Sequence, residues 1–423
     1  MEKKSAYLYY FILIVIMALW DGIGIMIPMA LRIGYFALVF LPLIKWRELI
    51  PAVFVSTITI AFSAFTSPLL PTSIFYYEFL LFGLFVIIIG QNLITPSIIF
   101  IFIFLYVLLS NIIIDSSISY TAIKILFCLL MFSFVKGDGG KCNEHMPYAF
   151  MMIAIVLSYW VLLRPEARTY AIHIQQGYEE AGAWTDPNYL GCIIALGGTV
   201  AINELFNKKE NLLKTLFCVS TMVFSIFALA YLASRGAFVA LVTGAVVLVV
   251  FSKKTKNNTK LVFVILMTIF LIFMYRSSYF DLIIIRFQAE SMETGTGRTI
   301  IWANKLDDFF NKSNIFRWIF GFGNNKGLTL GKLDGGIRAA HNDFVTVLVT
   351  YGFVGLFLFL YTFYYAIKKA SKTNKVAVCS LLGTYIAVCM TLDPTFSAMP
   401  TSVVFIFYLF YVLMFSRTKE TTV

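Results

Sequence analysis

A succession of long apolar runs constrains the fold of this chain more than any other feature. Hydrophobic residues make up 60% of its 423 residues and charged residues only 13%. A soluble domain of ordinary composition has about 45–50% apolar and about 25% charged residues. Many runs reach the length of roughly 20 residues that a helix needs to cross a bilayer. The chain is therefore predicted to be an integral, polytopic membrane protein built of helices.

The apolar runs predict about fourteen membrane-spanning helices, each within the usual range of roughly 17–25 residues or slightly shorter. Their approximate positions are 6–20, 23–44, 49–66, 74–90, 97–114, 120–135, 147–163, 188–206, 211–232, 236–251, 260–275, 340–366, 377–392 and 399–415. One long polar interval, 276–339, separates the eleventh span from the twelfth. We expect an all-α membrane domain over 1–423 with this one large loop inserted.

The lysines and arginines predict the orientation of the spans. If the N-terminus lies inside and the spans alternate, most lysines fall in inside segments. The short outside turns at 21–22, 67–73, 115–119 and 393–398 contain neither lysine nor arginine. This is the positive-inside pattern, so both termini are predicted to be cytoplasmic and the loop 276–339 to be periplasmic. It also explains the net charge of +11 without a nucleic-acid partner.

The cations of the large loop differ in type from those of the inside segments. Inside they are nearly all lysine, whereas the loop holds Arg276, Arg286, Arg298, Arg317 and Arg338. Arginine has a planar group that grips phosphate or carboxylate with two hydrogen bonds. A plainer alternative is that long loops cross a membrane whatever their charge, and that these arginines pair with acidic residues such as Asp307, Asp308 or Glu179. The whole set favours an anion site.

An amphipathic helix is predicted within the loop at 299–310. The apolar residues of one face are Trp302, Leu306, Phe309 and Phe310, and the polar residues placed elsewhere are Asn304, Lys305, Asp307 and Asp308. This pattern is typical of a helix that lies on a membrane surface.

Several polar residues are predicted to meet at the outer face. Arg235 begins the tenth span, Arg298 follows a Gly-Thr-Gly segment, and His341 begins the twelfth span. The eighth span also starts outside, with Asp186 as a possible N-cap and Pro187 as its first residue. The N-termini of helices attract anions. Together these features favour a polyanion site, with a lipid-linked diphosphate as the natural ligand.

His341 is one of three histidines and has two alternative roles. Beside an anion site it can act as a general base that takes a proton from an attacking hydroxyl group. Alternatively, it caps its helix or pairs with Asp343.

The motifs as a set resemble the O-antigen ligase/polymerase superfamily, which contains the Wzy polymerases and the WaaL ligases. The resemblance covers roughly 184–366. It is carried by Asp186-Pro187-Asn188, Ser234-Arg235-Gly236-Ala237, Gly297-Arg298 with Trp302, Gly321-Phe322-Gly323, His341-Asn342 and Tyr351-Gly352.

The resemblance implies a GT-C-like, inverting and metal-independent glycosyltransferase in the bacterial inner membrane, with its active site on the periplasmic side. The donor would be a glycan on undecaprenyl diphosphate, and no cofactor would be needed. Arg235 and Arg298 would bind the leaving diphosphate, and His341 would activate the acceptor. Further substrate contacts are expected from Arg338, Asn342 and Asn188. A chain-length regulator is left open as a partner.

The acceptor distinguishes two functions within this superfamily. A polymerase extends another lipid-linked repeat unit, whereas a ligase transfers the glycan to lipid A–core. About fourteen spans resemble the polymerases more than the twelve-helix ligases, so a polymerase is expected. A third hypothesis is a flippase for lipid-linked oligosaccharides, but a transporter should place its charges along a central cavity.

Overall fold

The structure is a computed structural model that describes residues 98–115, 125, 139–163, 187–207, 212–252, 257–276, 281, 284, 298–331, 339–372, 374–395 and 402–415. All regular structure in these residues is helical. The helices are α5 (Ile98–Ser110), α7 (Gly139–Leu163), α9 (Pro187–Asn207), α10 (Leu212–Leu232), α11 (Arg235–Phe251), α12 (Asn257–Arg276), α14 (Arg298–Asn311), α15 (Ile315–Phe320), α16 (Asn324–Thr329), α17 (Asp343–Lys369), α18 (Lys375–Thr391) and α19 (Ser402–Phe415), with a π-helical turn η2 (Asn111–Asp115) after α5.

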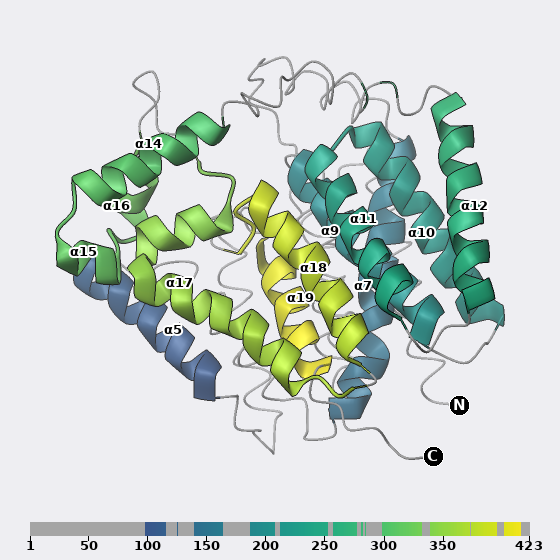
Figure 1. The fold of residues 1–423 in the computed structure, drawn as a ribbon, viewed down its shortest axis with the longest axis horizontal. Helices are drawn as coiled ribbons and strands as arrows, with labels where there is room; N and C mark the ends of the chain where they lie inside the picture. Colours follow the sequence, from purple (N-terminus) through teal and green to yellow (C-terminus); the bar gives the residue numbers. More distant parts are fainter. Residues whose placement is uncertain are drawn as a thin grey trace, which may run out of the picture.

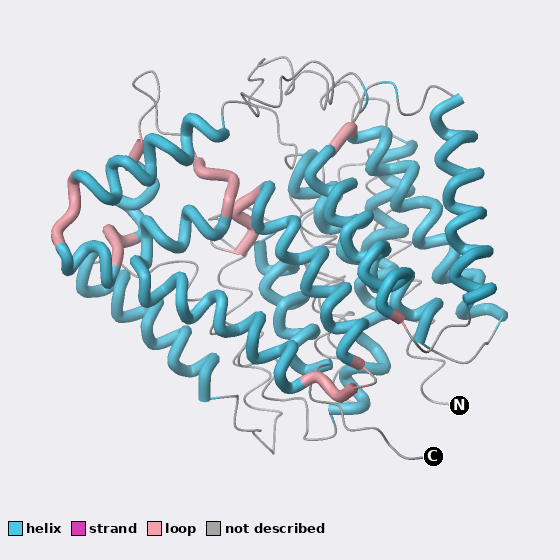
Figure 2. The backbone as a smooth tube through the Cα atoms, viewed as in Figure 1, coloured by secondary structure: helices cyan, strands magenta, loops and turns pink. Residues whose placement is uncertain are grey.

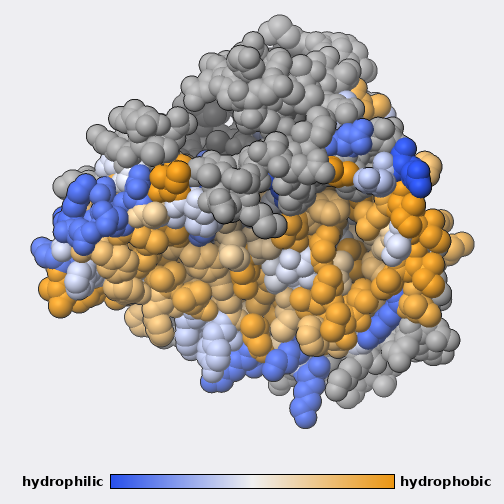
Figure 3. All heavy atoms as spheres, turned by 45° about the horizontal axis from the view of Figure 1, so that its top comes forward, coloured by the Kyte–Doolittle hydropathy of each residue, from blue (hydrophilic) through white to orange (hydrophobic). Residues whose placement is uncertain are grey.

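The described helices identify a membrane protein. Four segments are long and apolar enough to cross a bilayer, namely Met146–Leu163, Pro187–Phe206, Lys214–Leu232 and Asp343–Lys369. Shorter apolar helices include Arg235–Phe251 and Lys375–Thr391. Figure 3 shows a broad hydrophobic band across one face, with hydrophilic residues gathered at its edges.

The predicted spans agree with these helices wherever the two can be compared. Every predicted span from 147–163 onward coincides with a described helix, as does 97–114 with α5 and η2. The first four predicted spans lie outside the described residues, and of 120–135 only residue 125 is described. The total of about fourteen spans and the GT-C architecture therefore stay predictions.

A bundle of five helices forms one half of the molecule. α9 packs against α7, α10 and α11, and α11 packs along α18 (Figure 1). Polar side chains join the buried helix faces: Thr199 and Thr384 share a hydrogen bond of 3.0 Å, and the Ser380 hydroxyl donates to the Gly244 carbonyl at 2.8 Å. Small residues and hydrogen bonds of this kind stabilise helix pairs in membranes, where the surrounding lipid is as apolar as the side chains.

α17 is broken in the middle, and the loop motif Gly321-Phe322-Gly323 packs into the break. Gly352 has φ 66° and ψ −167°, which interrupts the helical hydrogen bonds. The amide of Phe322 donates to the Val349 carbonyl at 3.0 Å, and the amide of Gly323 donates to the Thr350 carbonyl at 2.9 Å. Irregular backbone at membrane depth requires such internal partners.

The short helices α14, α15 and α16 pack over the first half of α17 (Figure 1). The helix predicted at 299–310 is confirmed as α14. Its predicted faces are partly wrong, because Lys305 is buried with Ile301 and Phe309, whereas Phe310 is exposed. Phe309 packs against Leu348 and Val349 of α17. The buried face of α14 is therefore the one that carries Ile301, Lys305 and Phe309.

Candidate functional site

Three helix starts and one helix end meet at one end of the bundle. The starts are those of α9, α11 and α17, and the end is that of α18. The Ser234 hydroxyl, just before α11, donates to the side-chain oxygen of Asn188 in α9 at 3.4 Å. The amide of Asp343 donates to the Leu392 carbonyl at 3.1 Å, which joins the start of α17 to the end of α18. Figure 2 shows the loops that enter α17 and leave α18 close together.

Arg235 is the first residue of α11, as predicted. It follows Ala233, which has a positive φ of 50°, and the extended residue Ser234. A Cβ atom on the next residue, Gly236, would lie 2.7 Å from the side chain of Thr391, so only glycine permits this approach of α11 to α18. The sequence Ser-Arg-Gly therefore places Arg235 beside the end of α18.

Arg298 is the first residue of α14 and reaches the same end of α18. Its guanidinium Nη1 donates to the Thr391 carbonyl at 2.8 Å. This carbonyl belongs to the last turn of α18, where the helix dipole favours a cation. Thr391 thus contacts both Arg298 and the glycine that follows Arg235. The structure therefore brings the first turns of α11 and α14, which carry these two predicted arginines, to the same end of α18.

His341 faces a buried carboxylate, Asp393. Its Nδ1 lies 3.8 Å from Asp393 Oδ1, and this oxygen also accepts a hydrogen bond of 2.6 Å from the Tyr189 hydroxyl. The His341 side chain is 33% exposed, whereas that of Asp393 is 7% exposed. The separation is too long for a hydrogen bond, so Asp393 faces the imidazole as a charge at ion-pair distance. A histidine with a partly exposed ring beside a buried carboxylate is a candidate general base.

The alternative roles considered for His341 are filled by other residues. The side chain of Asn342 caps α17 by accepting from the amides of Phe344 and Val345. The wholly buried carboxylate of Asp343 accepts from the amide of Thr395 at 3.1 Å. α17 therefore begins at Asp343 rather than at His341, and His341 lies in the preceding loop with a positive φ of 48°.

Trp302 ties α14 to the His341 loop. Its indole Nε1 donates to the Ala340 carbonyl at 2.6 Å. Arg298 and Trp302 are four residues apart and so lie on one face of α14. Arg298 contacts the end of α18, and Trp302 contacts the loop that precedes α17. α14 consequently contacts both segments that carry the pair, the loop with His341 and the end of α18 that leads to Asp393.

Two residues of this cluster were missed by sequence reasoning, Asp393 and Tyr189. Asp393 lies in the turn 393–398, whose sequence indicates only an outside turn without lysine or arginine. One signal in the sequence could have indicated Asp393 as a site residue. It is a carboxylate that follows an apolar span directly and has no cation near it in the sequence. Of the other predicted substrate contacts, Asn188 lies beside Ser234, and Arg338 lies outside the described residues.

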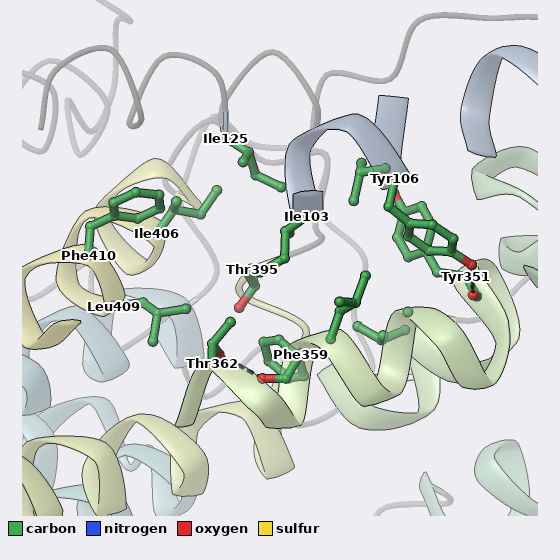
Figure 4. A pocket seen from close by; sticks show the side chains of 14 residues that line it. Ile103, Tyr106, Ile125, Tyr351, Phe359, Thr362, Thr395, Ile406, Leu409 and Phe410 are labelled. Carbon is green, nitrogen blue, oxygen red and sulfur yellow. Dashed lines mark hydrogen bonds between the residues drawn. The ribbon is translucent and has the colours of Figure 1, made fainter. Parts of the chain in front are cut away.

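An apolar pocket borders this polar cluster. It is formed by α5, α17 and α19 together with Thr395 (Figure 4). Its walls include Ile103, Phe359, Ile406 and Phe410. The amide of Thr395 binds the Asp343 carboxylate, so one residue belongs both to the pocket wall and to the turn that carries Asp393.

Comparison with known proteins finds one family. A family model described as O-antigen ligase matches residues 220–360, about a third of the chain. The matched segment contains Arg235, Arg298 and His341. The resemblance to the O-antigen ligase/polymerase superfamily is thereby confirmed, and the match supports a ligase- or polymerase-type function and a glycosyltransferase-like enzyme. No curated protein matches the chain.

Proposed function

We propose that this membrane protein of the O-antigen ligase/polymerase superfamily is a polymerase of lipid-linked repeat units. It transfers the growing glycan from undecaprenyl diphosphate to the non-reducing-end sugar of another lipid-linked unit. The observation that carries the proposal is the meeting of Arg235, Arg298 and the His341–Asp393 pair around the end of α18. The match over residues 220–360 supports the superfamily and does not distinguish a polymerase from a ligase.

In this proposal the arginines bind the diphosphate of the donor. Arg235 lies at the N-terminus of α11, where free amide groups and the helix dipole attract an anion. The guanidinium of Arg298 reaches the end of α18 beside the start of α11, and its planar group is suited to binding phosphate. As the sugar leaves, negative charge grows on the diphosphate, and fixed cations stabilise that charge in the transition state.

His341 is the proposed general base. The Asp393 carboxylate, 3.8 Å from Nδ1, stabilises the imidazolium that forms when Nε2 takes the proton of the acceptor hydroxyl. The acceptor oxygen then forms a bond to the anomeric carbon while the bond from that carbon to the diphosphate oxygen breaks. The electron pair of the broken bond stays on the diphosphate, and attack from the opposite side inverts the anomeric centre.

The remaining predicted substrate contacts, Asn342, Asn188 and Arg338, are proposed to bind the substrate without taking part in the bond changes. The side-chain oxygen of Asn342 is used to cap α17, so only its amide nitrogen is offered to substrate. Asn188 accepts from the hydroxyl of Ser234, the residue that precedes Arg235 and α11. Arg338 keeps its proposed role in binding the donor. The apolar pocket next to Thr395 is consistent with a substrate that carries a hydrocarbon chain.

The proposed location is the bacterial inner membrane, with both termini cytoplasmic and the site on the periplasmic face. This rests on the positive-inside pattern of the sequence. The remainder of the architecture, about fourteen spans in a GT-C arrangement, belongs to the same proposal. The substrate partner is a lipid-linked oligosaccharide, and a chain-length regulator is left open.

Three alanine variants test the site in cells that lack their own polymerase gene. Arg235→Ala, Arg298→Ala and His341→Ala should each abolish the ladder of surface polysaccharide on a gel while the protein still inserts. Lys372→Ala is the control, because Lys372 is exposed in the turn between α17 and α18, at the opposite ends of both helices from the site. Normal ladders from all three variants would refute the site.

Reconstitution separates the polymerase from its alternatives. The purified protein is supplied with a lipid-linked repeat unit, with and without lipid A–core. Polymer growth without core supports the polymerase. Transfer only in the presence of core would replace it with the ligase that the family description names. Movement of the unit across the bilayer without transfer would instead indicate the flippase.

A further inference from the structure

The turn that carries Asp393 is bound on both sides by one residue, Asp343. The amide of Asp343 donates to the carbonyl of Leu392 at 3.1 Å, and its carboxylate accepts from the amide of Thr395 at 3.1 Å. Leu392 and Thr395 enclose Asp393 and Pro394 in the sequence. Asp343 therefore fixes the backbone on either side of Asp393.

The backbone between these two points has little freedom of its own. Pro394 holds φ at about −65° and has no amide hydrogen. A residue that precedes proline is restricted to extended conformations, and this applies to Asp393. Leu392 is extended as well, with φ −142° and ψ 174°. Once Asp343 binds both ends of the turn, the direction in which the Asp393 side chain leaves the backbone is set.

Asp343 also stands close to the other member of the candidate pair. It is the first residue of α17 and follows His341 by two positions. The loop before α17 and the loop after α18 lie close together (Figure 2). The distance of 3.8 Å from His341 Nδ1 to Asp393 Oδ1 depends on how these two loops are held. Asp343 joins them through its backbone and through its side chain.

The cap of α17 does not require the Asp343 carboxylate. The side chain of Asn342 supplies the cap by accepting from the amides of Phe344 and Val345. Asp343 is wholly buried, and burial of a carboxylate is costly unless its oxygens are bound. Its hydrogen bond to Thr395 lies outside its own helix, so the carboxylate serves the turn that leaves α18.

Neighbouring helices hold the side chains of the same turn. The Tyr189 hydroxyl of α9 donates to Asp393 Oδ1 at 2.6 Å. The hydroxyl groups of Tyr385 in α18 and Thr395 share a hydrogen bond of 2.6 Å. Asp393 and Thr395 are only 5% and 4% exposed. The backbone of the turn is bound by α17, while α9 and α18 bind its side chains.

We propose that Asp343 is a positioning residue that holds the turn 392–395 so that Asp393 faces His341 at ion-pair distance. The proposal rests on the proposed function for its consequence, because the pair matters for transfer only if His341 is the base. Asp343 acts through the turn and not on the substrate, since its side chain is wholly buried.

Hydrogen exchange of the Thr395 amide tests the contact without any substrate. The protein is placed in nanodiscs, and exchange is resolved to single residues by mass spectrometry with fragmentation. Asp343→Leu has nearly the shape of aspartate but no acceptor, so exchange at Thr395 should become faster by roughly tenfold or more. Asp343→Asn keeps an acceptor oxygen and should retain slow exchange. Unchanged exchange in a folded Asp343→Leu protein would overturn the proposal.

A second variant covers a failure of the first to fold. Asp343→Ala then takes the place of Asp343→Leu in both measurements. If neither variant folds, the proposal is overturned, because Asp343 would be required by the fold as a whole and not by the turn.

A double-mutant cycle in the transfer assay tests whether the turn acts through Asp393. With a lipid-linked repeat unit, Asp343→Leu should lower kcat on the order of 10²-fold, as expected for a displacement of about 1 Å, with KM little changed. In an Asp393→Asn background the same change should cost little more, because the charge that the turn positions is already absent. Asp343→Asn should keep most of kcat. Additive losses, or an equal loss in Asp343→Asn, would overturn the proposal.

Ser380→Ala is the matched control. It also removes a buried side chain that binds a backbone group, since the Ser380 hydroxyl donates to the Gly244 carbonyl at 2.8 Å within the bundle. It should leave exchange at Thr395 and kcat unaltered. The same changes in Ser380→Ala as in Asp343→Leu would overturn the proposal, because any lost hydrogen bond of the bundle would then have this effect.

The two measurements separate this inference from the proposed function. Absence of transfer by the unmodified protein would refute the proposed function. Exchange at Thr395 would still decide whether Asp343 holds the turn.

Discussion

The hydroxyl of Tyr106 in α5 donates to the backbone carbonyl of Tyr351 in α17 at 2.6 Å. This contact completes a set of three. The three carbonyls just before the break at Gly352, those of Val349, Thr350 and Tyr351, accept hydrogen bonds from outside the helix. The first two receive amides from the loop motif 321–323, and the third receives the Tyr106 hydroxyl. Groups far apart in the sequence therefore make the irregular turn possible inside a membrane.

Tyr106→Phe should lower the stability of the protein. It removes the donor to the Tyr351 carbonyl, and a buried carbonyl left without a partner costs about 1–3 kcal/mol. The thermal unfolding midpoint in detergent measures the effect. Tyr159→Phe is the control, because Tyr159 is 44% exposed. Equal midpoints for the two variants would show that the hydroxyl of Tyr106 does not stabilise the break.

Gly352→Ala should be more damaging than Tyr106→Phe. A side chain is strained at this φ and ψ by roughly 1–3 kcal/mol, and its Cβ would also collide with the Ile319 carbonyl. The matched control is Gly383→Ala in α18, where a Cβ would make an ordinary contact of 3.5 Å with Thr243. Comparison of detergent-solubilised yield and unfolding midpoint tests this. A protein equally stable with alanine at 352 and at 383 would contradict the role given to the break.

Much of the fold could be predicted from hydrophobicity alone, but the break in α17 could not. The apolar run at 340–366 predicts one continuous helix, and a single glycine inside such a run is compatible with a helix. The interruption at Gly352 depends on Ile319 and Gly321, which lie thirty residues earlier in the sequence. Local patterns contain no information on such a contact.

The same reason explains the error in the faces of α14. The sequence predicts a surface helix with Lys305 on its solvent-facing side, because the apolar residues of the other face are Trp302, Leu306, Phe309 and Phe310. In the structure, the segment around Leu330 and Gly331 packs against Lys305. A buried lysine violates hydrophobic patterning, and such violations are expected where a residue serves a site.

The candidate site was predicted in part because its cations mark the starts of helices. Arg235, Arg298 and His341 each stand where an apolar or amphipathic segment begins, and this is visible in the sequence. Asp393 is the carboxylate partner of His341, yet it lies 52 residues further along the chain in a turn without other charges. Its partnership depends on the packing of α17 against α18, which the sequence does not reveal.

The segment that covers Lys305 should become less stable in acid. Hydrogen bonding from Lys312 lowers the pKa of Asp308, and the amide of Gly331 acts in the same direction. Because the folded-state pKa is depressed, the stabilisation is fully present above the ordinary value of 3.8 and is lost as the pH falls below it. The difference in unfolding midpoint between the unmodified protein and Asp308→Asn should therefore shrink at low pH. A difference that is constant with pH would argue against an ionised Asp308 as its source.

Asp393→Asn should reduce transfer while leaving donor binding nearly intact. The amide still accepts from the Tyr189 hydroxyl, but the negative charge that lies 3.8 Å from His341 Nδ1 is lost, and with it the stabilisation of the imidazolium. Loss of a correctly held general base costs roughly 10²- to 10⁴-fold in rate. The loss should appear in kcat, with KM for the lipid-linked donor little changed, because the arginines are untouched.

Asp307→Asn is the control for this variant. Asp307 is exposed on α14 and accepts from Asn311 at 2.6 Å, so the same chemical change is made away from the site. It should leave kcat unaltered. If Asp393→Asn instead raised KM with an unchanged kcat, Asp393 would act on binding of the donor, and His341 would have to function as a base without a carboxylate to orient it.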